Sequence, residues 1–443
     1  MVTLLSIATA LFAGLKMTRL FSRFKLPDVT AYLIAGILAG PFVLGRLGIP
    51  GLGFVSNTSV EALSVFSDVA LGFIAFSIGS EFNLTALRKT GRQAAIIGIV
   101  QAVFTTVVVD LAMIGIHFLM PQTLSLPAAI TLGAIAAATA PAATLMVVRQ
   151  YKAKGELTSL LLPIVALDDA VGLIVFAVSF GIAKALSSGR ADLISILADP
   201  LLEIVLSLLL GAAAGMVLKK LETMFHSNSN RLSMTITFII LTVGLSMLSF
   251  KAGPVTVGFS SLLVCMMLGT IFVNISPLAE DLMGRANRWS VPVLVLFFVL
   301  SGAGFNLSVF SRGSIMLIGL VYILTRCLGK YFGARLSSKA VNCSKEVVRY
   351  LGITLFPQAG VALGMCVTAD QLPGDGPLIR NIILFTVLVY EIAGPLMTKW
   401  ALTRSGDIRP KPAEVLGRRE QKLAEVKDKP LLKSRRERQL SSR

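Results

Sequence analysis

The sequence predicts an all-α membrane protein of about 13 transmembrane helices. We expect two inverted-topology repeats of six helices with a linking helix between them. We also expect crossed, discontinuous helices at the functional site. Three observations lead to this prediction: the composition, the spacing of long apolar runs, and polar motifs that recur at one offset. Of the 443 residues, 55% are apolar and 15% are charged, and the mean hydropathy is +0.80. Because a soluble domain carries about 25% charged residues, the composition alone indicates a membrane protein.

Apolar windows divide the chain into thirteen candidate spans joined by short connections. Most are close to the length of about 20 residues that crosses a bilayer. Together they form one transmembrane domain, residues 1–403, which a basic tail follows at residues 404–443. The basic residues of the first run come after it, which favours a spanning helix over a cleaved signal peptide. The predicted spans are 2–20, 27–45, 59–79, 93–119, 126–148, 157–185, 198–218, 232–250, 254–274, 288–306, 312–335, 346–369 and 377–402.

The basic residues of the loops are divided unevenly between the two membrane faces that thirteen spans imply. One face carries 19 lysines and arginines, and the other carries 6. Cytoplasmic loops are enriched in these residues, so the richer face is predicted to be cytoplasmic. The N-terminus is then outside and the tail inside, in a multi-pass protein of the plasma membrane, the inner membrane of a prokaryotic cell.

The net charge of +17 follows from this topology and does not indicate a nucleic-acid partner, because the charges lie in loops and in the tail. The tail carries 13 basic and 6 acidic residues, a balance that favours contact with anionic lipid. The four cysteines are scattered, with no CxxC pair and no neighbouring histidine. We therefore interpret them as small buried side chains and expect no cofactor.

The sixth span holds two adjacent carboxylates, Asp168 and Asp169, inside an apolar run from about Leu157 to Ala185. An ionisable side chain at mid-bilayer costs about 2.5–3.5 kcal/mol on insertion scales, so an adjacent pair indicates a function. The two side chains leave the helix about 100° apart, and neighbouring buried carboxylates resist being charged together. A cation and a proton would then compete for one site, which is the minimum that antiport requires.

A short motif occurs twice, as Gly79-Ser-Glu-Phe-Asn-Leu-Thr85 and as Gly302-Ala-Gly-Phe-Asn-Leu-Ser308, 223 residues apart. The same offset relates Asp168 to Glu391, the only carboxylate of the last span. Because the offset covers seven spans, an odd number, it reverses the direction of each element across the membrane. Inverted repeats of this kind are typical of secondary transporters. Spans 1–6 and 8–13 would be the repeats, with span 7 as the linker.

Proline interrupts two spans at matching positions of the predicted repeats. Span five contains Thr139 and Pro141, and span twelve contains Pro357. Proline removes a backbone donor and frees a carbonyl one turn earlier, and unwound backbone at membrane depth persists only inside protein or beside a wet cavity. A matched pair of interrupted spans therefore indicates a transport site.

Arg326 lies in the middle of span eleven, where a buried cation needs an acidic neighbour. We expect it to neutralise Asp168, Glu391 or Asp68. Two roles stay open for it, a structural salt bridge and direct participation in gating.

Several stretches resemble the monovalent cation/proton antiporter superfamily, which includes the bacterial sodium/proton exchangers. Residues 25–45 resemble its second-helix signature. The sequence Thr139-Ala-Pro141 and the Asp168-Asp169 pair resemble its crossing helix and its ion-binding helix, and residues 326–335 resemble its eleventh helix. The resemblance covers about residues 1–403.

The resemblance implies that Asp169 is the principal ligand for Na⁺ and for the transported proton. It also implies that Asp168 is the second carboxylate, that Thr139 contributes from the interrupted helix, and that a core domain moves against a dimerisation domain in a homodimer. Members with paired aspartates that work electrogenically often have a lysine in the tenth helix, and residues 289–307 contain none. The stoichiometry therefore stays open, with Arg326 as the candidate for charge compensation.

Other functions remain possible for this sequence, as does Li⁺ or K⁺ as the cation. An ion-coupled symporter of organic anions would need basic or aromatic ligands near Pro141 and Pro357, and we find none. A ligand-gated K⁺ efflux/proton antiporter would usually carry a large nucleotide-binding domain. An intramembrane aspartyl protease, the one enzyme considered, would need two aspartates on different helices; here they are adjacent, so we expect a transporter and no enzyme.

Overall fold

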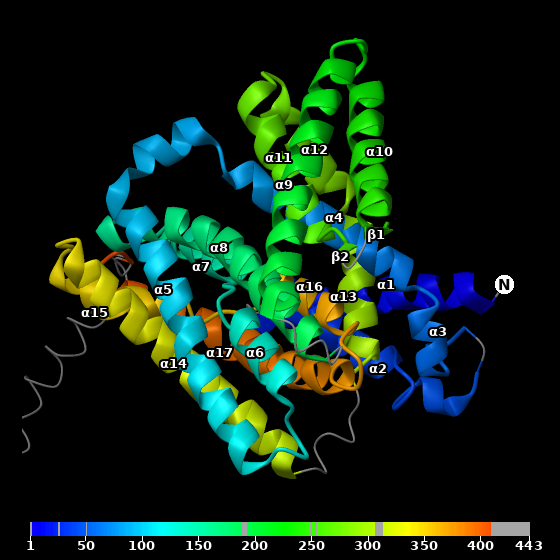
Figure 1. The fold of residues 1–443 in the computed structure, drawn as a ribbon, viewed down its shortest axis with the longest axis horizontal. Coiled ribbons are helices and arrows are strands. Elements are labelled where there is room, and N and C mark those ends of the chain that lie inside the picture. The colour runs from blue at the N-terminus through cyan, green and yellow to red at the C-terminus, as the bar shows by residue number, and fades with distance from the viewer. Residues whose placement is uncertain are drawn as a thin grey trace, which may run out of the picture.

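The computed structural model (Figure 1) describes residues 2–24, 27–49, 51–187, 193–248, 250–252, 255–305 and 313–408. In the first half of the chain the elements are α1 (Val2–Phe21), η1 (Ser22–Phe24), α2 (Asp28–Ala39), η2 (Gly45–Leu47), α3 (Asn57–Glu61), α4 (Ser64–Glu81), α5 (Leu84–Leu119), α6 (Leu126–Ile135), α7 (Pro141–Tyr151), α8 (Glu156–Ser187) and α9 (Leu193–Glu222). In the second half they are α10 (Asn228–Ser246), β1 (Phe250–Ala252), β2 (Val255–Val257), α11 (Ser261–Ile275), α12 (Ala279–Trp289), α13 (Val291–Ala303), α14 (Gly313–Ala340), α15 (Lys345–Thr354), α16 (Gly360–Ala369) and α17 (Gly376–Arg404).

Each predicted span overlaps one helix or a broken pair of helices, so the all-helical fold class is confirmed. The described residues add one feature that was not predicted, an antiparallel pair of three-residue strands, β1 and β2. Six described helices are long and apolar enough to cross a membrane, or seven if α12 and α13, bent by 48°, form one span. Five further apolar helices are shorter. The total of thirteen crossings and the repeat architecture remain predictions.

The two spans that were predicted to be interrupted at a proline are both broken in the described structure. Span five consists of α6 and α7 with residues 136–140 between them, and Pro141 is the first residue of α7. Proline is well suited to that position because the first helical residue has no amide partner in any case. Span twelve consists of α15 and α16, and Pro357 lies between them. The backbone restriction of proline favours both interruptions, whereas Pro163 in α8 and Pro395 in α17 lie inside continuous helices.

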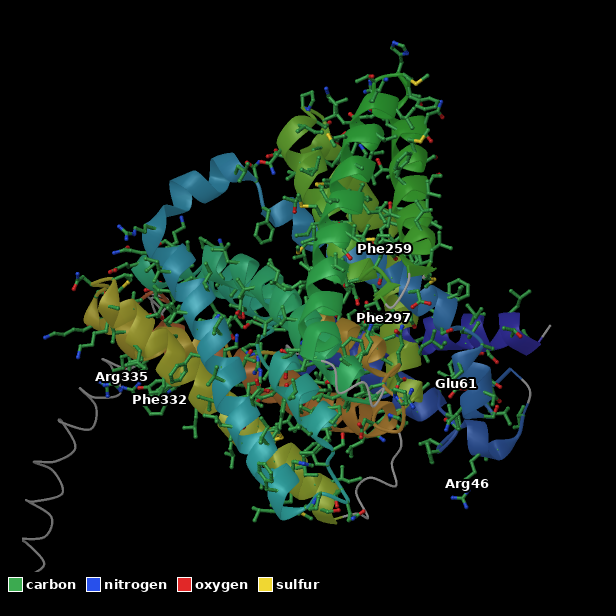
Figure 2. The ribbon with its side chains drawn as sticks, viewed as in Figure 1. Arg46, Glu61, Phe259, Phe297, Phe332 and Arg335 are labelled. Atoms are coloured by element: carbon green, nitrogen blue, oxygen red, sulfur yellow. The ribbon has the colours of Figure 1, made fainter. Side chains whose placement is uncertain are left out.

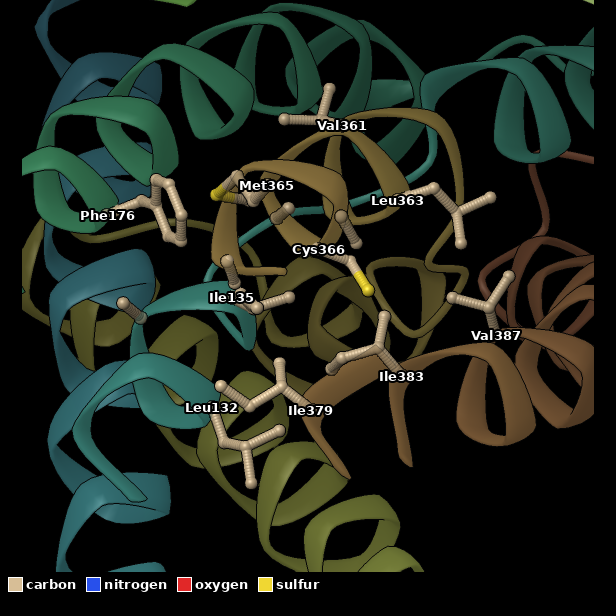
Figure 3. Packing of buried hydrophobic residues seen from close by; sticks show 14 of the residues in the cluster. Leu132, Ile135, Phe176, Val361, Leu363, Met365, Cys366, Ile379, Ile383 and Val387 are labelled. Carbon is tan, nitrogen blue, oxygen red and sulfur yellow. The ribbon is translucent and has the colours of Figure 1, made fainter. Parts of the chain in front are cut away.

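The largest apolar core surrounds these interruptions. It takes buried side chains from α6, α8, α16 and α17, among others (Figure 3). The long helices α5 and α14 run side by side along one side of this core, and α9 and α11 pack together on another side (Figure 1). The interrupted helices are therefore enclosed by continuous ones, which is the setting that unwound backbone needs at membrane depth.

Glycines allow two helix pairs to pack with their backbones in contact. In the α2–α13 pair, a Cβ on Gly302 would overlap the Leu33 carbonyl oxygen. In the α4–α11 pair, a Cβ on Gly79 would overlap the Met266 carbonyl oxygen. Gly79 and Gly302 open the two copies of the predicted motif, and residues 306–308 of the second copy lie outside the described residues.

We expect Gly302→Ala to lower the free energy of unfolding by at least about 2 kcal/mol, because α2 and α13 would have to separate. Thermal unfolding of the purified protein in detergent would measure this. The matched control is Gly244→Ala in α10, where a Cβ meets nothing within 4 Å and alanine is the better helix former. Equal unfolding temperatures for Gly302→Ala and the unmodified protein would contradict the packing described here.

The last described residues contact the start of α8. The carboxylate of Asp407 accepts hydrogen bonds from the backbone amide and the hydroxyl of Thr158, each at 2.7 Å. The carbonyl of Asp407 accepts a third from the Lys154 amide at 3.0 Å. Amides of the first helical turn have no partner within the helix, so Asp407 caps α8 from a distant part of the sequence.

Candidate functional site

The two interruptions meet each other directly. The amide of Ala140 donates to the carbonyl of Pro357 at 2.9 Å. The hydroxyl of Thr144 donates to the Thr354 carbonyl at 3.3 Å. Segments that lie more than 200 residues apart in sequence thus satisfy part of each other's unwound backbone, which the low dielectric of the membrane interior requires.

Asp168, on α8, lies where the interruptions meet, and it is fully buried. Its Oδ2 accepts a short hydrogen bond from the Thr139 hydroxyl and pairs with the Lys330 ammonium at 2.6 Å. Its Oδ1 accepts a hydrogen bond from the Gln101 side-chain amide at 2.5 Å. Helices α5, α8 and α14 and the α6–α7 break each contribute one group, so Asp168 is the centre of the polar site.

Lys330 was not singled out from the sequence, yet it forms the only ion pair found between fully buried side chains in the described part of the chain. Its ammonium also donates a short hydrogen bond to the Ala137 carbonyl in the α6–α7 break. The resemblance directed attention to residues 289–307 for a lysine. A sufficient signal was present elsewhere, because Lys330 follows Arg326 by four residues and therefore lies on the same helix face.

Asp169 is also fully buried, one position further along α8. The Lys330 ammonium pairs directly with Asp168, and Asp169 is the next residue along the helix. Asp168 faces the crossed breaks, and because adjacent side chains leave a helix about 100° apart, we expect Asp169 to face a different direction. The cation-binding roles expected for Asp169 and Asp168 stay predictions.

Arg326 contacts the interruptions through carbonyl groups. Its guanidinium donates to the carbonyls of Ala136, Phe356 and Ala138 at 3.0, 2.7 and 2.6 Å, and it lies 4.6 Å from the centre of the Tyr390 ring. We expected this cation to neutralise Asp168, Glu391 or Asp68. Instead, Asp168 is paired with Lys330, and these hydrogen bonds of Arg326 go to carbonyl oxygens. Carbonyls freed at both breaks present enough negative charge to hold a guanidinium.

Gln358 is a second residue that the sequence reasoning passed over. Its side-chain amide donates to the Ile135 carbonyl at 3.0 Å and to the Tyr322 hydroxyl at 3.1 Å. It therefore satisfies a carbonyl at the end of α6 from the opposite interruption. Its position beside Pro357 was the available signal, since polar side chains near a broken helix often bond to the freed backbone groups.

Glu391 lies apart from this site in its contacts. It is buried on α17 and accepts a hydrogen bond at 3.3 Å from the hydroxyl of Thr30 on α2. One turn further along α17, Gly394 packs against Pro357, where an added Cβ would come within 2.8 Å of the proline ring. The structure thus groups Asp168, Thr139, Pro357 and Arg326, and it places Glu391 at the contact between α17 and α2.

The grouped atoms include oxygen donors of the type that binds a small hard cation. Carboxylate, hydroxyl and carbonyl oxygens are the ligands that hard cations prefer, and Asp168, Thr139 and the carbonyls of both breaks supply them within one buried region. The carbonyl of Leu355 also lies 3.4 Å from the Thr139 hydroxyl. Lys330 occupies the carboxylate oxygen that such a cation would use.

Comparison with known proteins gives a consistent result. The Na⁺/H⁺ antiporter NhaS4 of Synechocystis is 25% identical over 86% of this chain and 92% of its own length. The K⁺/H⁺ antiporter subunit KhtU of Bacillus subtilis is 23% identical over 85% of this chain and 88% of its own length. The structure of the sodium proton antiporter MjNhaP1 from Methanocaldococcus jannaschii superposes with a TM-score of 0.68 and 18% identity, covering 91% of this chain and 97% of that one. Residues 7–404 match the family described as "Sodium/hydrogen exchanger, transmembrane", and the chain belongs to that family.

Proposed function

We propose that this protein is a secondary transporter that exchanges Na⁺, or Li⁺ or K⁺, for H⁺ across the plasma membrane by alternating access. The relatives support cation/proton exchange, because their names include Na⁺/H⁺ and K⁺/H⁺ antiporters. The observation that carries the proposal is the buried Asp168–Lys330 pair at the junction of two broken helices. Burying such an ion pair costs desolvation free energy. We therefore interpret the pair as a place where the partner of the Asp168 carboxylate changes during transport.

Competition for Asp168 provides the coupling. A cation can use the Asp168 Oδ2 only after the Lys330 ammonium leaves that oxygen or gives up its proton, because both occupy the same position. A proton supplied later to the pair releases the cation and restores the pairing. The site therefore holds either the cation or the proton-bearing partner, and this exclusion couples their movements.

Asp169 and Thr139 complete the proposed site. Asp169 is the second buried carboxylate, adjacent to Asp168 in the sequence, and Thr139 supplies a hydroxyl ligand that already contacts Asp168. Pro141 and Pro357 keep the backbone open, and Arg326 holds the freed carbonyls in place. The number of protons that move with each cation depends on how many of these groups lose charge in one cycle.

Alternating access requires that the site move relative to other helices. The resemblance to the family implies that a core domain moves against a dimerisation domain formed by the first helices of each repeat. We therefore propose a homodimer. The Thr30–Glu391 contact joins α2 to α17 and is therefore a candidate for the boundary between the moving parts. The N-terminus is outside and the tail cytoplasmic in this proposal, as the loop charges predict.

The test of the proposed function is an exchange assay. Everted vesicles that contain the protein and hold a preset acidic interior should lose their pH gradient when Na⁺, Li⁺ or K⁺ is added, and vesicles without the protein should not. The cation that acts at the lowest concentration identifies the substrate. A gradient that survives all three cations would reject the proposal, and uptake of a labelled organic anion with Na⁺ would favour symport.

We expect Asp169→Asn to reduce the exchange rate at least tenfold, because the change removes one carboxylate charge while the Asp168–Lys330 pair remains. The rate of gradient loss in everted vesicles measures the effect, after normalisation to protein content. Asp281→Asn is the control, since the Asp281 side chain is 53% exposed on α12 and pairs with Arg285 at the surface. An Asp169→Asn variant that matches this control would remove Asp169 from the site.

A further inference from the structure

A basic pocket lies between the end of α14 and the start of α15. Its volume is about 810 Å³, and its lining includes four basic residues, Arg335, Lys339, Lys345 and Arg349. All four side chains are exposed, and the ion pairs found in the described part of the chain lie elsewhere. Charges of one sign around a concavity create a local positive potential that favours a bound anion.

The acidic residues near the pocket are too few to neutralise its positive charge. Glu156 accepts a hydrogen bond from the Ser344 amide at 3.4 Å, and Glu346 lies in the first turn of α15. Two acidic residues do not balance four basic ones. The Arg335 guanidinium is held in place by a hydrogen bond of 3.2 Å to the Tyr331 hydroxyl, so one of the four cations is already oriented.

An exposed apolar stripe along α14 leads to this pocket. Its side chains are between 44% and 55% exposed and follow one another at intervals of three or four residues, namely Leu317, Leu320, Leu324, Leu328, Phe332 and Leu336. Leu328, Arg335 and Lys339 are separated by seven and eleven residues, about two and three helical turns, and therefore share a face. Figure 2 shows Phe332 and Arg335 at the outer edge of the molecule, beside α14 and α15.

We propose that α14 and α15 form a binding site for one anionic phospholipid, with its phosphate in the basic pocket and an acyl chain along the apolar stripe. The stripe alone would accept any lipid, and the pocket alone would accept any phosphorylated anion. Their continuity on one helix face selects a molecule that carries both parts. The pocket lies on the face richer in basic residues, where membranes present anionic headgroups to cytoplasmic loops.

The experiment measures lipid binding to the intact, purified protein by native mass spectrometry during titration with phosphatidylglycerol and with phosphatidylcholine. We expect phosphatidylglycerol to bind at least tenfold more tightly than phosphatidylcholine. The variant Arg335→Gln/Arg349→Gln should reduce that preference by a factor of ten or more, since each charge near an anionic headgroup contributes about fivefold. The variant Leu324→Gln/Leu328→Gln, which alters exposed positions only, should weaken binding of both lipids.

Two controls test whether binding depends on this pocket and on a whole lipid molecule. Lys219→Gln/Lys220→Gln removes two exposed charges at the end of α9, on the same predicted membrane face, and should keep the preference. If it lowers binding as much as the pocket variant does, the attraction is diffuse and the site is rejected. Glycerol phosphate that binds as tightly as the lipid would indicate a soluble anion instead, and a second protein copy that displaces the lipid would indicate a protein interface. Either result overturns the proposal.

Discussion

Replacing Asp168 by asparagine is expected to abolish cation-driven loss of the pH gradient in everted vesicles and to lower the free energy of unfolding by about 3–5 kcal/mol. The amide keeps the shape of the side chain but carries no charge. It therefore removes the carboxylate that pairs directly with the buried Lys330 ammonium. Exchange assays and thermal unfolding in detergent measure the two effects separately.

A double variant separates folding from transport at this position. We expect Asp168→Asn/Lys330→Met to recover most of the lost stability, because the uncompensated cation is gone and methionine occupies a similar volume. It should still fail to exchange, since the carboxylate that both ions need is absent. Exchange by either variant would show that Asp168 is not the group for which the ions compete.

Arg326→Ala is expected to lower the free energy of unfolding by about 4 kcal/mol or more, since three hydrogen bonds from a charged donor are lost at once. The loss would leave three carbonyls from both interruptions without their donor. Scaled to 443 residues, a loss of this size lowers the unfolding temperature by about 4 °C.

Arg285→Ala is the control for this experiment. Arg285 pairs with Asp281 at the surface, and exposed pairs of this type contribute about 1 kcal/mol or less. An Arg326→Ala protein with an unchanged unfolding temperature but no exchange would assign the residue a direct role in ion movement. Such a result would reverse the structural role that its contacts indicate.

The fold class could be predicted because a membrane-spanning helix needs an apolar run of about 20 residues. Such a run can be recognised in the sequence without knowing what it packs against. The helix breaks followed in the same way, since Pro141 and Pro357 act on their own backbone. The three-residue strands β1 and β2 could not be predicted in this way. They lie where the predicted spans 232–250 and 254–274 adjoin, and both spans are apolar enough to be interpreted as helices throughout.

The partners within the site could be predicted only in part. Helical periodicity gives the face on which Asp168 lies but not which residues of other helices meet it. The sequence places Lys330 on the same face as Arg326, but the contacts of Lys330 and Gln101 with Asp168 depend on how the fold brings α14, α5 and α8 together. The error over Arg326 has a different cause. We sought a carboxylate for each buried cation, whereas the breaks at residues 136–140 and 355–359 expose carbonyl oxygens that also need donors.

The attachment of Asp407 to Thr158 has a practical consequence for anyone who shortens this protein. A truncation after Ile408 would discard the basic extension and leave the start of α8 intact. A truncation a few residues earlier would remove Asp407 and its hydrogen bonds to Thr158. The first turn of α8, the helix that carries Asp168, would then be less stable. Loss of activity in the shorter form could then be mistaken for evidence that the extension regulates the exchanger.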